Sequence, residues 1–177
     1  MDKNEGITIK NADICFRNFE GRPGRYNKPG DRNFCVMLED DIARTFEEDG
    51  WNVKYLKPRE EGDRPKPYLE VKINFDSFRP PKVYLVSSRG KNRLDADDVK
   101  MLDLADLARV DFIVRPYEWE ANGKSGISAY LKTLYATIVE DDLDLLYSNT
   151  PDSAENTIGG CGCCDACDGS CSNHHAD

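Results

Sequence analysis

Short stretches in which apolar and polar residues alternate follow one another along this chain, and this pattern is typical of β-strands. The clearest stretch is residues 68–75, where Leu69, Val71, Ile73 and Phe75 fall on one face and polar side chains on the other. Because strand side chains alternate between two faces, this apolar set is predicted to face a core. We predict seven strands in all, at residues 7–16, 32–38, 51–57, 68–75, 82–87, 110–119 and 127–139.

Other signals interrupt the strands. Residues 11–13 of the first strand predict a bend, and residues 40–49 predict a short helix that ends at Gly50. An acidic cluster at Asp95 predicts a second helix that continues to about residue 108, and Asn122-Gly123 predicts a hairpin turn. This pattern predicts a mostly β fold, a small barrel or sandwich with mostly antiparallel strands and one or two short inserted helices.

Charge divides the chain into two parts. All 24 Lys and Arg residues lie at or before Lys132, whereas nine of the 33 Asp and Glu residues follow it, so the net charge of −9 belongs to the end of the chain. From about residue 147 the chain is rich in Ser, Asn, Asp and Gly, a composition that predicts disorder. We therefore predict a charge-balanced folded domain at 1–140 and an acidic, Cys-rich flexible tail at 141–177.

The apolar segments are short. No run approaches the roughly 18 residues that a membrane-spanning helix needs, and the first ten residues lack the apolar centre of a signal peptide. We therefore expect no membrane association and a cytoplasmic location.

Residues 17–31 form the first candidate binding surface. Three glycines and two prolines predict a loop, and basic residues alternate there with Phe19 and Tyr26. Single-stranded DNA is bound by this combination, since cations follow the phosphates and aromatic rings stack on unpaired bases. The alternative interpretation is a basic loop that is only solvated.

The outward face of the later strands is the second candidate surface. Tyr117, Trp119 and Tyr130 have polar or basic neighbours, whereas Trp51 and Phe75 belong to apolar alternating sets and are predicted core residues. The predicted DNA-binding residues are Arg17, Arg22, Arg25, Tyr26, Lys28, Arg32, Lys54, Arg79, Lys82, Tyr84, Arg115, Tyr117, Trp119, Lys124, Tyr130 and Lys132.

Catalytic signals are weak. The only histidines are His174 and His175, and the sequence contains no Gly-rich phosphate-binding loop. We expect a protein that is not an enzyme. The alternative is a metal-dependent nuclease whose carboxylates would come from strands or their ends, such as Asp76, Asp111 and Glu118.

Five of the seven cysteines lie within residues 161–171. Cys161, Cys164, Cys167 and Cys171 could bind zinc, in which case the protein could be a zinc-containing protein-interaction module. Reduced, flexible thiols are the alternative, and no other cofactor is expected. Cys15 and Cys35 are predicted to be buried in strands.

The stretch 139–146 alternates acidic and apolar residues. It could bind a basic partner protein, compete with DNA for the protein's own basic groove, or only increase solubility.

Several segments, in this order, resemble the single-stranded DNA-binding proteins of tailed bacteriophages. They include Arg17-Asn18-Phe19, Arg32-Asn33-Phe34, Gly50 to Lys54, Arg115-Pro116-Tyr117-x-Trp119 and Ala129 to Lys132. The resemblance covers roughly residues 6–140, and the Cys-rich extension after Gly159 departs from it.

The resemblance implies an OB-fold-like barrel with an inserted helix and an acidic C-terminal tail that contacts replication or recombination proteins. It also implies cooperative or homodimeric binding in some members. The function that we expect is sequence-independent binding of single-stranded DNA in phage-type replication, recombination or repair, in the host cytoplasm if a phage encodes the protein.

Overall fold

The computed structural model describes residues 6–150, which divide into a β-rich body up to Asp141 and a short segment from Asp142 onward. The second segment contains one helix, α2 (Asp142–Tyr147), with acidic residues in its first turn. The sequence pattern did not predict this helix. The predicted disorder beyond residue 150 lies outside the described residues.

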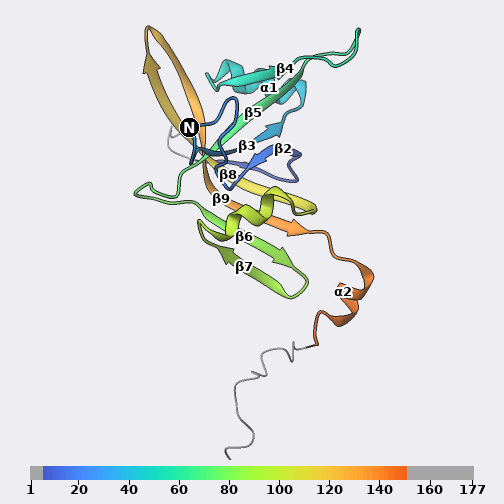
Figure 1. Ribbon diagram of the computed structural model, residues 1–177. Coiled ribbons are helices and arrows are strands. Elements are labelled where there is room, and N and C mark those ends of the chain that lie inside the picture. The colour runs from blue at the N-terminus through green and yellow to red at the C-terminus, as the bar shows by residue number, and fades with distance from the viewer. Residues whose placement is uncertain (1–5, 151–177) are drawn as a thin grey trace, which may run out of the picture. The chain divides into compact units, whose positions relative to one another are not determined.

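One sheet makes up the body (Figure 1). Its strand order is β1-β8-β9-β5-β3-β2, while β4 pairs with β5, and β6 pairs with β7 and β9. The strands are β1 (Ile7–Ile9), β2 (Ile14–Asn18), β3 (Arg32–Met37), β4 (Val53–Leu56), β5 (Lys66–Ile73), β6 (Lys82–Ser87), β7 (Gly90–Leu94), β8 (Leu107–Ala121) and β9 (Lys124–Ile138).

The predicted class, a mostly β, OB-fold-like domain with short helices, is confirmed. Most strand pairs are antiparallel, but β5 and β6 both pair with β9 in parallel, so the sheet is mixed. The prediction of a barrel needs correction, because β1 and β2 lie at the two ends of the strand order and the sheet does not close.

The predicted bend in the first strand is confirmed, and it separates β1 from β2. Asn11 has a φ of 49°, in the left-handed region, and its N–H donates to the Asp111 carboxylate over 2.8 Å. The Ala12 N–H donates to the Val110 carbonyl over 2.9 Å. Both hydrogen bonds fix the bend to β8, so the chain can pair with β8 through β1 and with β3 through β2.

The core lies between the apolar faces of the strands. Phe34 is fully buried, and its ring centroid lies 5.5 Å from that of Phe19 and 5.2 Å from that of Phe112. Trp51 is buried as predicted and contacts Phe46 of α1 (Asp40–Glu48). These aromatic contacts join the helix, the first strands and the long β8–β9 hairpin into one core.

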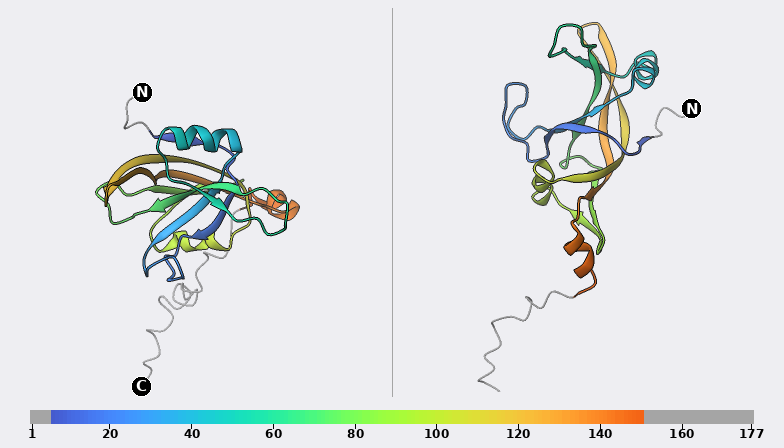
Figure 2. Two further views of the ribbon diagram at one scale, coloured as in Figure 1. Left: turned by 90° about the horizontal axis from the view of Figure 1, so that it is seen from above. Right: turned by 90° about the vertical axis from the view of Figure 1, so that its right-hand side faces the viewer.

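Two local features differ from the sequence pattern. The region predicted as a helix to residue 108 contains only a short 3₁₀ helix, η1 (Asp98–Asp103), and β8 starts at Leu107. The strand β7 was not among the seven predicted strands, and it forms a hairpin with β6. In both places strand pairing satisfies the backbone better than local propensity suggests. α1 lies on one side of the body, and η1 lies on the opposite side with the loop 19–31 (Figure 2).

Candidate nucleic-acid interface

The loop at residues 19–31, called the basic loop below, is held at its base by Asn18. The Asn18 side-chain amide donates to the carbonyls of Arg22 and Asp31 over 3.0 and 3.1 Å, and its oxygen accepts the Arg22 N–H over 2.8 Å. One side chain therefore joins the two ends of the loop.

A second anchor connects the basic loop to η1. The Phe19 side chain is buried in the core, and the backbone N–H groups of Phe19 and Glu20 donate to the Asp103 carboxylate over 2.7 and 3.1 Å. The far part of the loop presents Tyr26, which is 88% exposed, with the Arg25 guanidinium 5.6 Å from its ring centroid. The anchored loop thus presents an exposed aromatic ring beside a cation, a combination that is typical of single-stranded DNA binding.

Two adjacent hollows continue from the basic loop across the sheet, and together they are called the groove. The first is about 590 Å³ and the second about 410 Å³, and Asn74 and Tyr130 line both. The first is also lined by Tyr26, Asn27, Arg32, Asn33, Glu70 and Lys72, and the second by Ser77, Arg79, Arg115 and Tyr117, among others.

Strand register explains why these side chains meet. Asn33 of β3 lies opposite Lys72 of β5, Lys72 lies opposite Tyr130 of β9, and Tyr130 lies opposite Arg115 of β8. The buried residues Phe34 and Val71 alternate with this set and face the core. Four strands therefore place one row of polar, cationic and aromatic side chains on the outward face.

Arginine and aromatic side chains hold one another in position in the groove. The rings of Tyr117 and Tyr130 contact edge to face, with centroids 5.4 Å apart. Arg115 donates from Nη2 to the Arg79 carbonyl over 3.2 Å, and the Arg32 guanidinium lies 5.1 Å from the Phe75 centroid. Ordering these long side chains before a ligand arrives lowers the entropy cost of binding.

The carboxylate of Glu70 in the groove is already paired. The Lys54 ammonium donates to it over 2.8 Å and the Asn33 side-chain amide over 3.1 Å. Partial burial disfavours the charged form of Lys54, but the hydrogen bond and the charge of Glu70 outweigh it and raise the pKa of Lys54. This pairing weakens the repulsion that Glu70 would exert on a phosphate.

The groove includes Tyr26, Arg32, Arg79, Arg115, Tyr117 and Tyr130 of the predicted residues. Several others lie elsewhere: Arg17 donates to the carbonyls of Leu102 and Ala105, Arg22 pairs with Glu20, Lys54 pairs with Glu70, and Lys82 and Tyr84 lie on β6. Arg25 and Lys28 lie on the basic loop, Lys132 lies in β9, and Trp119 and Lys124 lie in the part of the β8–β9 hairpin nearest its turn.

Sequence reasoning missed Asn33, Lys72 and Asn74 as groove residues. Lys72 was predicted to face outward, but its neighbours in the sequence include no exposed aromatic residue. Only its pairing with Tyr130, 58 positions away, makes it part of a binding surface.

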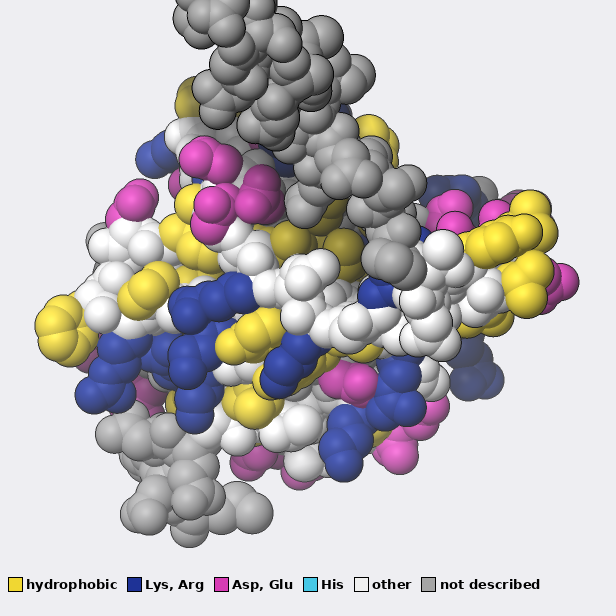
Figure 3. Space-filling model, turned by 90° about the horizontal axis from the view of Figure 1, so that it is seen from below, with side chains coloured by type: hydrophobic (Ala, Val, Ile, Leu, Met, Phe, Trp, Pro, Cys, Tyr) yellow, Lys and Arg dark blue, Asp and Glu magenta, His cyan; other side chains and the backbone are white. Residues whose placement is uncertain are grey.

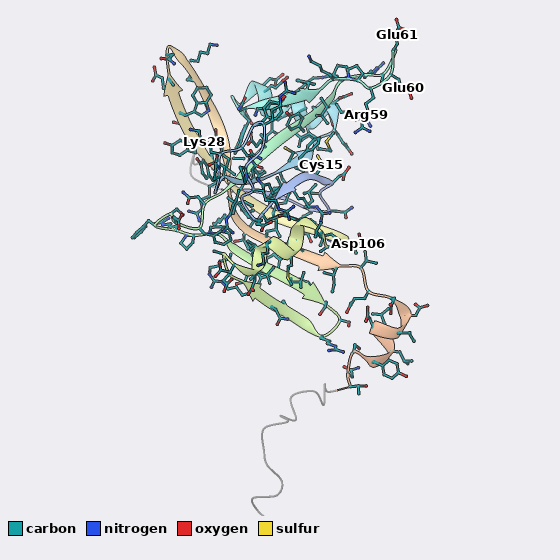
Figure 4. The ribbon with its side chains drawn as sticks, in the orientation of Figure 1. Cys15, Lys28, Arg59, Glu60, Glu61 and Asp106 are labelled. Atoms are coloured by element: carbon teal, nitrogen blue, oxygen red, sulfur yellow. The ribbon has the colours of Figure 1, made fainter. Side chains whose placement is uncertain are left out.

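Charged side chains also gather at the connection between β4 and β5. Arg59, Glu60 and Glu61 lie at its tip, far from Lys28 of the basic loop (Figure 4). None of these three side chains lines the groove, so this connection is not part of the candidate interface.

Within the described part of the chain, the three predicted nuclease carboxylates lie in different places. Asp76 lines the first hollow of the groove. Asp111 pairs with Arg109, and Glu118 lies seven residues further along β8, roughly 23 Å away along a strand. Within residues 6–150, no group of three His, Cys, Asp or Glu side chains could hold a metal ion. The predicted zinc ligands Cys161, Cys164, Cys167 and Cys171 lie outside the described residues, so zinc binding there stays a prediction.

The two cysteines of the body face each other across β2 and β3. Burial raises the pKa of Cys35 to about 12, and burial together with Asp13 raises that of Cys15. Both thiols are therefore protonated at neutral pH and are poor nucleophiles.

Helices of the described region are short. None of them is long and apolar enough to cross a membrane.

An open, OB-fold-like sheet whose outward face carries a groove of tyrosines and cations defines a class, the proteins that bind single-stranded nucleic acid. The family model of the phage ssDNA-binding domain matches residues 1–169. The chain belongs to this family, and the resemblance predicted from the sequence is confirmed.

Solved structures share the fold. The single-stranded DNA-binding protein from bacteriophage Enc34, in complex with ssDNA, is 10% identical, with a TM-score of 0.53 over 80% of this chain and 93% of that chain. A C-terminal truncation of the Enc34 protein is 13% identical, with a TM-score of 0.51 over 77% of this chain and 87% of that one. No curated protein matches the sequence significantly. At sequence identities this low, the similarity shows a shared fold only.

Proposed function

We propose that this protein binds single-stranded DNA in the groove, without sequence preference, and coats it during phage DNA replication, recombination or repair. The observation that carries the proposal is the row from Asn33 through Lys72 and Tyr130 to Arg115, which crosses four strands on one face. Membership of the phage ssDNA-binding domain family and the Enc34 complex with ssDNA support it.

The mechanism combines two attractions that do not depend on base identity. Lys72, Arg79 and Arg115 would neutralise phosphates and release counterions, so binding is favoured by entropy. Tyr26, Tyr117 and Tyr130 would stack on bases, and every base has a π-face. Duplex DNA keeps its bases stacked inside the helix, so only a single strand can use both attractions.

A binding series tests the proposal. Fluorescence anisotropy with a labelled single DNA strand and the matching duplex of equal length should show the lower Kd for the single strand. This Kd should rise steeply with salt, since released counterions set the slope. Equal affinity for the duplex, or a Kd that does not change with salt, would contradict the proposal.

We further propose that the protein does not cleave the DNA that it binds. The separation of Asp111 from Glu118 supports this. Incubation of labelled DNA with Mg²⁺ or Mn²⁺ should leave it intact, and cleavage products would favour the nuclease alternative.

A further inference from the structure

A second aromatic surface lies on β6 and β9, outside the groove. The rings of Tyr84 and Tyr135 stack with centroids 4.9 Å apart and planes 11° apart. The Lys91 ammonium, from β7, lies 5.3 Å from the Tyr84 centroid and 5.8 Å from that of Tyr135. Two stacked rings with a cation over them combine the groups that single-stranded DNA requires. Tyr84 and Tyr135 are called the tyrosine pair below.

More cations surround the tyrosine pair. Arg93 lies opposite Tyr84 on β7, and Lys82 precedes Tyr84 by two positions on β6. Seen from the side of β6 and β7, Lys and Arg side chains gather around hydrophobic ones (Figure 3). The tyrosine pair faces outward, because its neighbours Val83 and Leu134 are fully buried.

A β-bulge brings the tyrosine pair onto the same face as the groove. Tyr130 and Tyr135 are five positions apart on β9, and in a regular strand an odd spacing places side chains on opposite faces. However, Val114 pairs with Leu131 and Ile113 with Thr133, so Lys132 has no partner on β8. This extra residue shifts the alternation, and both tyrosines lie on the outward side of the sheet.

The bulge also places a cation between the two surfaces. Lys132 is exposed, and its neighbour Thr133 pairs with Lys82 of β6. The outward residues of β9 thus run from Tyr130 past Lys132 to Tyr135. Five strand residues span about 16 Å, which corresponds to roughly five nucleotides at the stacked spacing and fewer in an extended strand.

We propose that the tyrosine pair is a second binding segment for single-stranded DNA, and that the strand passes from the groove over Lys132 to Tyr84 and Tyr135. This proposal rests on the proposed function of the groove. Short DNA strands occupy only the groove, whereas longer strands occupy the groove and the tyrosine pair. The length of DNA that one molecule covers is therefore set by β9 and its bulge.

Oligonucleotide length separates the two segments. The variant with Tyr84→Leu and Tyr135→Leu is compared with wild type by anisotropy, using a strand of about 3 nucleotides, too short to reach both segments, and one of about 20 nucleotides; the two lengths lie below and above the site sizes of OB folds. The Kd for the long strand should rise about 5- to 150-fold, and the Kd for the short strand should not change. Tyr84→Phe with Tyr135→Phe is the matched control and should bind both lengths like wild type.

The outcomes distinguish this proposal from the proposed function. If wild type binds neither strand, the groove proposal fails. If wild type binds both strands, and the double Leu variant binds the long strand as tightly as wild type does, the tyrosine pair does not bind DNA. A loss that is equal for the two lengths also overturns the proposal, since it indicates damage to the whole fold or to the groove.

A second variant keeps the tyrosine pair intact if the double Leu variant does not fold. Lys91→Gln removes the cation and leaves both rings in place. For the long strand, the slope of log Kd against log salt should fall by about one, and for the short strand it should stay the same. An unchanged slope for the long strand would contradict the proposal.

Discussion

Among single residues, Tyr130 has the central place in the groove. It lines both hollows, contacts Tyr117 edge to face, and has Lys72 and Arg115 as its partners on the neighbouring strands. Its ring is half-buried, so one part packs on the sheet and another remains open to a base.

Replacement of Tyr130 tests stacking directly. Tyr130→Leu should raise the Kd for single-stranded DNA of any length about 5- to 150-fold, because stacking on one base contributes about 1–3 kcal/mol. Tyr130→Phe keeps the π-face and should bind nearly as wild type does. Anisotropy titrations measure both, and Tyr55→Leu, at an exposed aromatic of β4, is the control. Equal affinity of Tyr130→Leu and wild type would exclude stacking at this position.

Asp111 is a structural carboxylate at the bend between β1 and β2. It accepts hydrogen bonds from Arg109 and from the Asn11 N–H, each over 2.8 Å. The hydrogen bond from Arg109 lowers the pKa of Asp111 most, and partial burial opposes it. Since the folded-state pKa lies below the unfolded value, its charge stabilises the fold above the unfolded pKa, and this stabilisation disappears as the pH falls through the folded pKa.

Asp111→Asn should therefore have an effect that depends on pH. Near neutral pH we expect a loss of roughly 0.5–1 kcal/mol in the free energy of unfolding, as for an exposed ion pair. Well below the ordinary Asp pKa of about 3.9 the variant and wild type should be equally stable. Urea unfolding across this pH range measures the difference. A loss that is as large in acid as at neutral pH would show that charge is not the cause.

At the scale of elements, one side chain of β2 makes a large share of the contacts that close the basic loop. Asn18 makes three of these hydrogen bonds, and the Gly30 N–H adds a fourth by donating to the Gly21 carbonyl over 2.9 Å. The Asn33 side-chain amide donates to the Asn27 side-chain oxygen over 2.9 Å. The position of Tyr26 beside the groove therefore depends on Asn18 together with these contacts.

Asn18→Ala should weaken DNA binding more than it weakens the fold. Without the amide, part of the loop must be ordered when DNA binds, so we expect a Kd increase of about 2- to 13-fold at an ordering cost of about 0.5–1.5 kcal/mol per immobilised side chain. Anisotropy and urea unfolding of the same protein separate the two effects. Asn52→Ala, beside Trp51, is the control. An unchanged Kd would mean that the loop does not contribute to binding.

For the strands, sequence pattern and structure agree where alternation is strict. Leu69, Val71 and Ile73 are buried as predicted, because a half-buried strand must alternate. The region from Asp95 to about residue 108 was predicted wrongly as a helix, because an acidic cluster is also compatible with a 3₁₀ turn before a strand. The residues at which η1 ends and β8 begins depend on the strand with which the backbone pairs.

For the whole molecule, the distribution of charge matters more than its sum. The first 138 residues have equal numbers of acidic and basic side chains, yet Arg79 and Arg115 line the second hollow of the groove and Lys91 lies over the tyrosine pair. The Glu140 carboxylate accepts hydrogen bonds from the Ser88 N–H and hydroxyl on the β6–β7 turn, each over 2.8 Å. The residue directly before the acidic segment 141–177 is therefore fixed to this turn.

We propose that the tail competes with DNA for these cations until a replication or recombination protein binds it. Deletion of residues 141–177 should lower the Kd for single-stranded DNA at low salt, and the difference should shrink as salt screens the charges. A variant with Asp141, Asp142 and Asp144 replaced by Asn keeps the chain length and should show part of the effect. Unchanged or weaker binding after deletion would contradict competition.

The sequence by itself determined the strand-rich class, the bend at residues 11–13, the core face of β5 and the separation of a charge-balanced body from an acidic end. These features follow from alternation, turn residues and charge, which act over a few neighbouring positions. The tertiary structure decided which outward residues meet. Lys72 reaches Tyr130 only through the β5–β9 pairing, and Tyr135 shares a face with Tyr130 only because Lys132 forms a bulge. Strand register depends on contacts between distant segments, and local pattern does not contain this information.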